Sequence, residues 1–166
     1  MSTLNNDMQE YQRQLKLGGI KAAYVGLIKL MSNLRIRFQN NHPELFVSNS
    51  IYPGMMDMTF FTLSPASLHK KKLKIVIVFL HETFQFEAWL SGANKQVQAR
   101  YWNFLKNNPP SAYPVVSNIN GTDAIITRIL VAGPDFSNLD ALTTKIEQSA
   151  LAFVSDMEIL AAALEM

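Results

Sequence analysis

The chain contains no cysteine among its 166 residues. This absence excludes disulfide frameworks, cysteine-based zinc sites and thiol nucleophiles, and it is typical of proteins from a reducing compartment. Glycine is scarce as well, at 7 residues, and no glycine-rich loop resembles a phosphate cradle. Charged residues make up 17% of the chain and apolar residues 48%. This balance excludes disorder caused by low hydrophobicity and high charge, and it predicts a packed core.

Long hydrophobic runs are also absent. The longest, IVIVFL at residues 75–80, is far shorter than the roughly 20 residues that cross a bilayer. The first residues, MSTLNNDMQEYQ, lack the basic and then apolar order of an export signal. The net charge of +2 is too small to indicate a basic face. We therefore expect a cytoplasmic protein with neither a membrane nor a nucleic acid as partner.

Two amphipathic helices are predicted at the start of the chain. Leu4, Met8, Tyr11 and Leu15 recur at three- and four-residue steps over residues 4–17, which is the period of one helix face. Gly18 and Gly19 then favour a break. A longer apolar stripe begins at residue 20 and ends near NNHP, where Pro43 disfavours helical geometry at His42.

The middle of the chain predicts strands. FVSNSIY and MMDMTFFTL flank a Pro-Gly turn, and LKIVIVFL at residues 73–80 has the composition of a strand buried on both faces. HET is a loop of hairpin length, so FQFEAWL is expected to return antiparallel beside it. SPASLHKKK reads as a polar connection with one helical turn.

The second half of the chain predicts a helix from about Asn94 to Lys106 and a proline-rich loop. Residues 124–132 fit a strand by their Ile and Val content, although their spacing also permits a short helix. Ser137 and Asp140 match a capping box that opens a long last helix. We therefore predict a single α+β domain over residues 1–166, with N-terminal helices, an antiparallel meander of three to four strands, a helix, a further strand and a long C-terminal helix.

Candidate ligand-binding residues gather in FEAWLSGANKQVQARYW, residues 86–102. The first functional hypothesis is a small-molecule-binding protein with a pocket near residues 87–102, because a few polar groups among aromatic side chains are typical of such pockets. A purely structural role as strand, cap and helix core is the competing interpretation. The candidates are Asp57, Glu87, Trp89, Lys95, Gln98 and Tyr101.

The second hypothesis is a metal-dependent phosphodiesterase, because the order of elements is compatible with restriction-endonuclease-like nucleases. Those enzymes hold a divalent cation between strand carboxylates, with a lysine nearby, to polarise the phosphoryl group. Asp57 and Glu87 are the candidate metal ligands and Lys95 the candidate lysine. Trp89 stands where that pattern places the lysine, and Asp57 lies one strand too early. The sequence indicates no particular cofactor.

The third hypothesis is an interaction protein that forms a homodimer through its helical surfaces. The apolar end ILAAALEM is the candidate contact, provided that Leu160, Leu164 and Met166 are exposed together.

Two polar features of the sequence are interpreted as structural and not as parts of a site. His42 and His69 are predicted to lie at the surface, and His81 in the hairpin loop. The basic cluster HKKKLK, residues 69–74, is predicted to be a solvated loop that protects a strand edge, with a phosphate contact as the alternative.

Several blocks of the chain carry a family resemblance. SIYPGMMDMTFFTLSP, LKIVIVFLHE and FEAWLSGANKQVQARYW, together with YQRQL and PDFSNLDALTTKIE, resemble a small bacterial family known only as a domain of unknown function. The resemblance covers most of the chain. It implies a free-standing bacterial cytoplasmic protein and assigns no catalytic residue, cofactor or substrate.

Overall fold

The computed structural model describes residues 1–164, and it has the predicted α+β architecture. The strands form a five-stranded antiparallel sheet in the order β1-β2-β3-β4-β5, so neighbours in the chain are neighbours in the sheet. The helices are α1 (Leu4–Leu17), α2 (Gly19–Asn41), α3 (Ala66–Lys70), α4 (Lys95–Asn107) and α5 (Leu139–Ala162). The strands are β1 (Phe46–Val47), β2 (Met58–Ser64), β3 (Leu73–Leu80), β4 (Gln85–Gly92) and β5 (Ile126–Ala132).

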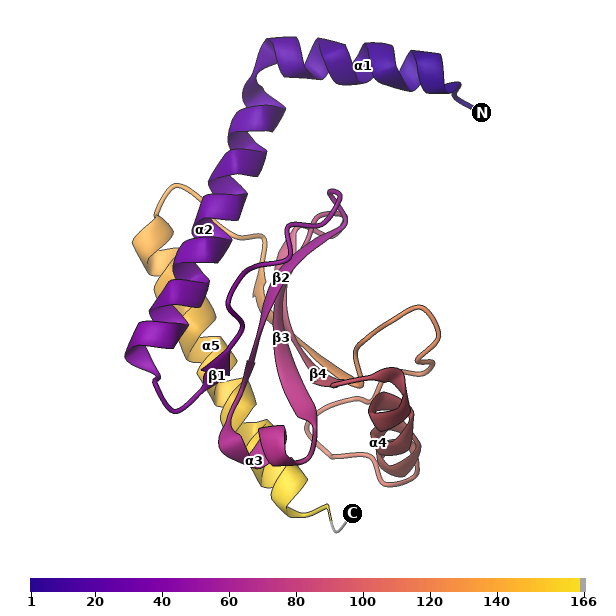
Figure 1. Ribbon diagram of the computed structural model, residues 1–166, viewed down its shortest axis with the longest axis vertical. Coiled ribbons are helices and arrows are strands. Elements are labelled where there is room, and N and C mark those ends of the chain that lie inside the picture. The colour runs from indigo at the N-terminus through magenta and orange to yellow at the C-terminus, as the bar shows by residue number, and fades with distance from the viewer. Residues whose placement is uncertain (165–166) are drawn as a thin grey trace.

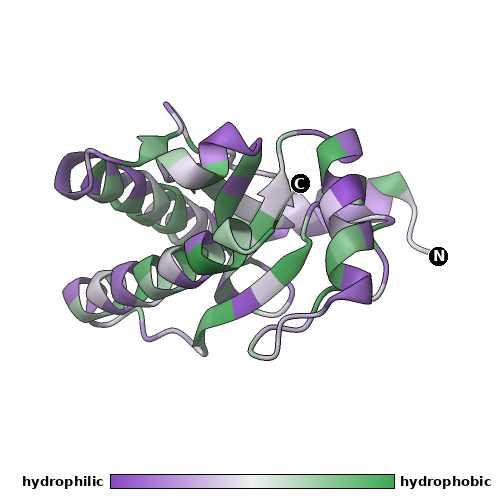
Figure 2. Ribbon diagram, turned by 90° about the horizontal axis from the view of Figure 1, so that it is seen from below, coloured by the Kyte–Doolittle hydropathy of each residue, from purple (hydrophilic) through white to green (hydrophobic). Residues whose placement is uncertain are grey.

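The sheet has two unequal faces. Phe61, Ile77 and Phe86 point to one face and join the main core, whereas Val78 and Trp89 point to the other and join a smaller cluster. Helices α2 and α5 cover the first face, and α4 lies beside the end of β4, where Tyr101 and Leu105 join the same main core (Figure 1). Seen from below, the ribbons of the long helices carry both green apolar and purple polar segments (Figure 2).

The central hairpin follows the predicted pattern. β3 pairs with β4 from Leu73↔Gly92 to Leu80↔Gln85, and most of β3 is buried, in agreement with its uninterrupted apolar sequence. Phe84 closes the turn with a φ of 56° and is 57% exposed, whereas Phe86, two residues later on β4, is fully buried. Residues 126–132 form strand β5, which resolves the helix alternative in favour of the strand.

Helices α1 and α2 are joined by one residue. Thr3 caps the start of α1, and Gly18 ends it in the left-handed conformation, with φ 82° and its N–H bonded to the carbonyls of Gln14 and Leu15. Helix α1 turns away from the line of α2 and extends beyond the body of the molecule (Figure 1). No residue of α1 is buried, and the buried residues of α2 begin only at Leu30.

Two details of the last helix differ from the sequence predictions. Asn138, not Ser137, caps α5 by accepting the N–H of Ala141, because the hydroxyl of Ser137 is already bonded to Asp135. At the other end Leu164 is 6% exposed and belongs to the core, so it is not part of an exposed apolar patch. Met166 lies outside the described residues. Within residues 1–164, no helix combines the length and the apolar character that a membrane crossing needs.

Gly92 sets the position of α4. A Cβ at this residue would lie 2.5 Å from the backbone N of Gln98 and 2.8 Å from its Cα, because the end of β4 runs directly against the first turn of α4. The side chain of Asn94 then caps α4 by accepting the N–H of Val97 at 2.9 Å. The close backbone approach and the cap together fix where the amino end of α4 lies.

We predict that Gly92→Ala lowers the free energy of unfolding by about 1–3 kcal/mol, because the added methyl group would collide with backbone that has no room to move. Gly26→Ala is the matched control. Gly26 lies inside α2 with nothing near its missing Cβ, so the same substitution there is expected to stabilise by up to about 1 kcal/mol. Urea unfolding of both variants measures the difference, and equal stabilities would contradict the close approach.

Candidate functional site

A cleft of about 350 Å³ lies between the turn that follows α3 and the first two turns of α4. It is within the size range of small-molecule sites. Its basic side chains come from two separate parts of the chain. The lining residues are Lys70, Lys71, Lys72, Asn94, Gln96, Val97, Arg100 and Tyr101, which we call the cationic cleft.

Backbone geometry holds the two walls of the cationic cleft together. Helix α3 ends at the lysine run, and Lys72 takes a left-handed conformation with φ 58° as the chain turns into β3. The carbonyl of Lys72 accepts the N–H of Ala93 at 2.8 Å. Because Ala93 precedes the cap of α4 by one residue, this bond ties the lysine turn to the start of the helix.

The electrostatics of the cationic cleft are one-sided. Three lysines and one arginine line it, and none of the lining residues within the described part of the chain is acidic. The ion pairs of residues 1–164 engage Arg13, Arg37, His42 and Arg128, so none of them involves a cleft cation. The amino end of α4 adds partial positive charge. The cleft therefore concentrates positive potential that nothing among the described residues neutralises.

Two cleft cations are oriented by neutral groups. The Nζ of Lys71 donates to the carbonyl of Leu164 at 3.1 Å. The guanidinium of Arg100 lies 5.2 Å from the ring centre of Tyr101 and 3.5 Å from its hydroxyl. These contacts hold the side chains in place and leave their charges available to a ligand.

Three of the residues proposed from the sequence lie on α4, but only one lines the cleft. Tyr101 is fully buried and forms part of the cleft floor. Gln98 is also buried, and its amide donates to the carbonyl of Thr122 at 2.9 Å, which ties α4 to the following loop. Lys95 is exposed in the first turn of α4 and is not among the lining residues.

Glu87 and Trp89 lie together on β4, away from the cationic cleft. The carboxylate of Glu87 accepts from the indole N–H of Trp89 at 2.7 Å and from the amide of Gln85 at 2.6 Å. Trp89 packs in the smaller cluster with Val76 and Val78. Glu87 and Trp89 therefore do not converge with Tyr101 on one cavity.

Asp57 lies in the turn before β2. Its carboxylate accepts the N–H of Met55 at 2.8 Å, and backbone hydrogen bonds from Met55 and Met58 lower its pKa. Glu87 bonds instead to Gln85 and Trp89 on β4, two strands away from β2 in the sheet. The carboxylates of the two proposed metal ligands therefore bond to different parts of the chain. Among residues 1–164, no group of three or more His, Asp or Glu side chains is arranged to hold a metal ion.

A second, apolar cavity of about 570 Å³ opens between the first half of α2 and the turns at the far end of the sheet. His81 is its main polar lining group. The hydroxyl of Thr59 donates its single hydrogen to the carbonyl of Pro53. In its contact with His81, at 2.9 Å, the hydroxyl is therefore the acceptor and the Nε2–H of His81 is the donor. Burial lowers the pKa of His81 and so favours the neutral ring, and the nearby charge of Asp57 only partly offsets this. We call this cavity the apolar cleft. The residues that line it are Ile20, Ala23, Tyr24, Gly26, Leu27, Leu30, Met56, Phe79, His81, Phe84, Phe136 and Leu139.

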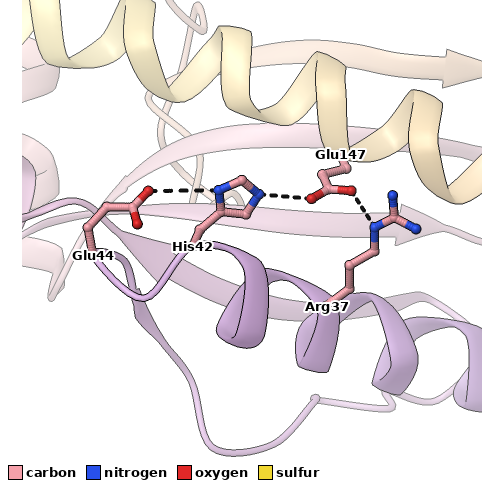
Figure 3. Close-up of polar contacts among 4 residues, drawn as sticks. All are labelled: Arg37, His42, Glu44 and Glu147. Carbon is pink, nitrogen blue, oxygen red and sulfur yellow. Dashed lines mark hydrogen bonds and ion pairs between the residues drawn. The ribbon is translucent and has the colours of Figure 1, made fainter.

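A polar cluster that the sequence did not reveal joins α2 to α5 (Figure 3). Glu147, on α5, is 7% exposed and accepts hydrogen bonds from Arg37 and from His42, the latter at 2.8 Å. His42 is therefore partly buried, and its prediction as a surface residue was wrong. Glu147 lies more than 100 positions from both Arg37 and His42 in the chain, and no local pattern signals their contact.

We predict that Glu147→Gln lowers the free energy of unfolding by about 1–3 kcal/mol at neutral pH, because Arg37 and His42 lose a charged acceptor. Burial alone would raise the pKa of Glu147, but the hydrogen bonds from His42 and Arg37 and the charge of Arg37 outweigh it and lower the pKa. The stabilisation is therefore present above the ordinary glutamate pKa of 4.5 and is lost as the pH falls through the lowered value.

Urea unfolding between neutral and acidic pH measures this effect. The difference between the wild type and Glu147→Gln should shrink on acidification. Glu158→Gln is the control, because Glu158 lies on the same helix, is partly exposed and bonds only to the hydroxyl of Ser67. A difference in unfolding free energy that does not depend on pH would contradict the attribution of this stabilisation to the ionised carboxylate of Glu147.

Comparison with known proteins identifies the family. No curated protein and no solved structure matches the chain. One family model, described as a domain of unknown function (DUF7000), matches residues 4–161, which span the chain from α1 almost to the end of α5. The chain therefore belongs to the DUF7000 family.

Proposed function

We propose that this protein binds a small anionic molecule, such as a phosphorylated metabolite, in the cationic cleft. The observation that carries the proposal is the lining of the cleft, which combines four basic side chains in about 350 Å³ and includes no carboxylate from residues 1–164. A multivalent anion in this cleft would meet Lys72 and Arg100 from opposite walls and lie close to the amino end of α4.

The rigidity of the walls supports this proposal. Lys72 is anchored through its carbonyl to Ala93, and Gly92 leaves no space between β4 and α4. The basic groups are therefore held near one another before a ligand arrives, although their like charges repel. Preorganised charges of one sign lower the ordering cost of binding a ligand of the opposite sign.

The cationic cleft overlaps the segment proposed from the sequence, residues 87–102, and Tyr101 is the one proposed residue among the lining residues of the cleft. Its small volume and the complete burial of Tyr101 favour a small molecule over a nucleic acid, because strand binding uses exposed aromatic rings for base stacking. The phosphodiesterase hypothesis gains no support, because the carboxylate of Asp57 bonds to the N–H of Met55, whereas that of Glu87 bonds to Gln85 and Trp89.

We predict that Lys72→Gln and Arg100→Gln each weaken the binding of inorganic pyrophosphate about tenfold, because each removes a charged hydrogen-bond donor from one wall. Isothermal titration calorimetry measures the dissociation constants. Added salt should weaken the wild-type interaction as well, because mobile ions screen the exposed lysines.

Lys106→Gln is the matched control for these variants. It removes the same charge from the last turn of α4, where Lys106 lies over the ring of Trp102 and outside the cleft. Its affinity should equal that of the wild type. Equal losses in all three variants would show a diffuse charge effect, and no measurable binding by the wild type would contradict the proposal.

A further inference from the structure

Helix α1 carries an apolar stripe that no other segment of residues 1–164 covers. Leu4, Met8, Tyr11 and Leu15 fall on one side of the helix and are 77%, 52%, 54% and 38% exposed. An isolated helix of 14 residues is marginally stable in water, since most helical stability in proteins comes from packing an apolar face. The stripe therefore indicates a missing partner.

The apolar cleft is the second uncovered feature of the chain. It begins at Ile20, directly after α1, and continues along α2 to Leu30, with Phe84 and Phe136 on its opposite wall. Ile20, Phe84 and Phe136 are 43%, 57% and 38% exposed. An open apolar cleft beside a long helix is the kind of surface that receives the apolar side of an amphipathic helix.

The connection between α1 and α2 prevents the stripe from reaching the apolar cleft of its own chain. Only Gly18 separates the helices, and its N–H is bonded to the carbonyls at the end of α1. Folding α1 back along α2 would require an antiparallel helical hairpin, which needs a loop of about 2–5 residues. A helix from another molecule has no such restriction.

We propose that two copies of this chain form a reciprocal dimer in which α1 of each copy lies in the apolar cleft of the other. Each copy contributes one stripe and one cleft, so a two-fold axis closes the assembly and leaves neither feature uncovered. One side of a 14-residue helix covers about 300 Å². Counted over both surfaces of two such contacts, the buried area reaches about 1,200 Å², which is the lower limit for a specific interface.

Sedimentation velocity of the full chain, over loading concentrations from about 1 to about 500 μM, tests the proposal at the affinities expected of a small interface. We expect a reversible dimer in the wild type. Tyr11→Glu should raise its dissociation constant at least tenfold, because it places a charge in the stripe. Asn6→Asp adds the same charge on the opposite side of α1 and should leave the dimer unchanged.

Phe84→Asp tests the other half of the contact. Phe84 lies in an exposed turn, so the substitution leaves the fold intact, which circular dichroism of each variant verifies. It should weaken the dimer as Tyr11→Glu does. A mixture of the two variants should associate more tightly than either variant alone, because the mixed dimer keeps one intact stripe in one intact cleft.

Three results would overturn the reciprocal dimer. A wild type that stays monomeric over the whole concentration range would leave the apolar cleft to another occupant, such as an apolar small molecule. A dimer that is insensitive to Phe84→Asp would show that the two α1 helices contact each other outside the cleft. Failure of the mixed variants to associate more tightly than either alone would exclude the reciprocal exchange.

Discussion

The structure depends on the burial of β3, the one strand with a nearly continuous apolar sequence. Ile75 and Ile77 pack under α2 and α5, while Val76 and Val78 need cover on the other face. The sheet can therefore leave neither face fully open to water. The long helices pack on one face, whereas the smaller cluster on the other face includes Ala124 and Val116 from the loop before β5. A cleft lies at each end of the sheet.

At one end of the sheet, the β4–α4 connection brings two distant basic segments together. The lysine run follows α3, Arg100 lies on α4, and the contact of Gly92 with Gln98 leaves the two walls no freedom to separate. At the other end, the first half of α2 extends past the sheet and leaves the apolar cleft between itself and the hairpin turns. One end is charged and suited to a small anion, and the other is apolar and suited to a helix.

Much of the fold follows from local signals in the sequence. The apolar β3, the short loop before β4 and the stripe of α1 each carry a period or turn that predicts the element without knowledge of the rest. The candidate site was harder to predict from the sequence. Lys72 and Arg100 are separated by most of a hairpin, and no local pattern shows that the close approach at Gly92 brings them together. His42 was misjudged for the same reason, because its partner Glu147 lies on the last helix.

The most direct test of the account is a nuclear magnetic resonance titration of the ¹⁵N-labelled chain with inorganic pyrophosphate. We expect saturable chemical-shift changes in the amides of residues 70–72 and of the first two turns of α4, with little change at the apolar cleft. Changes centred on the apolar cleft, or small unsaturable changes spread over all exposed lysines, would contradict the cationic cleft as the binding site.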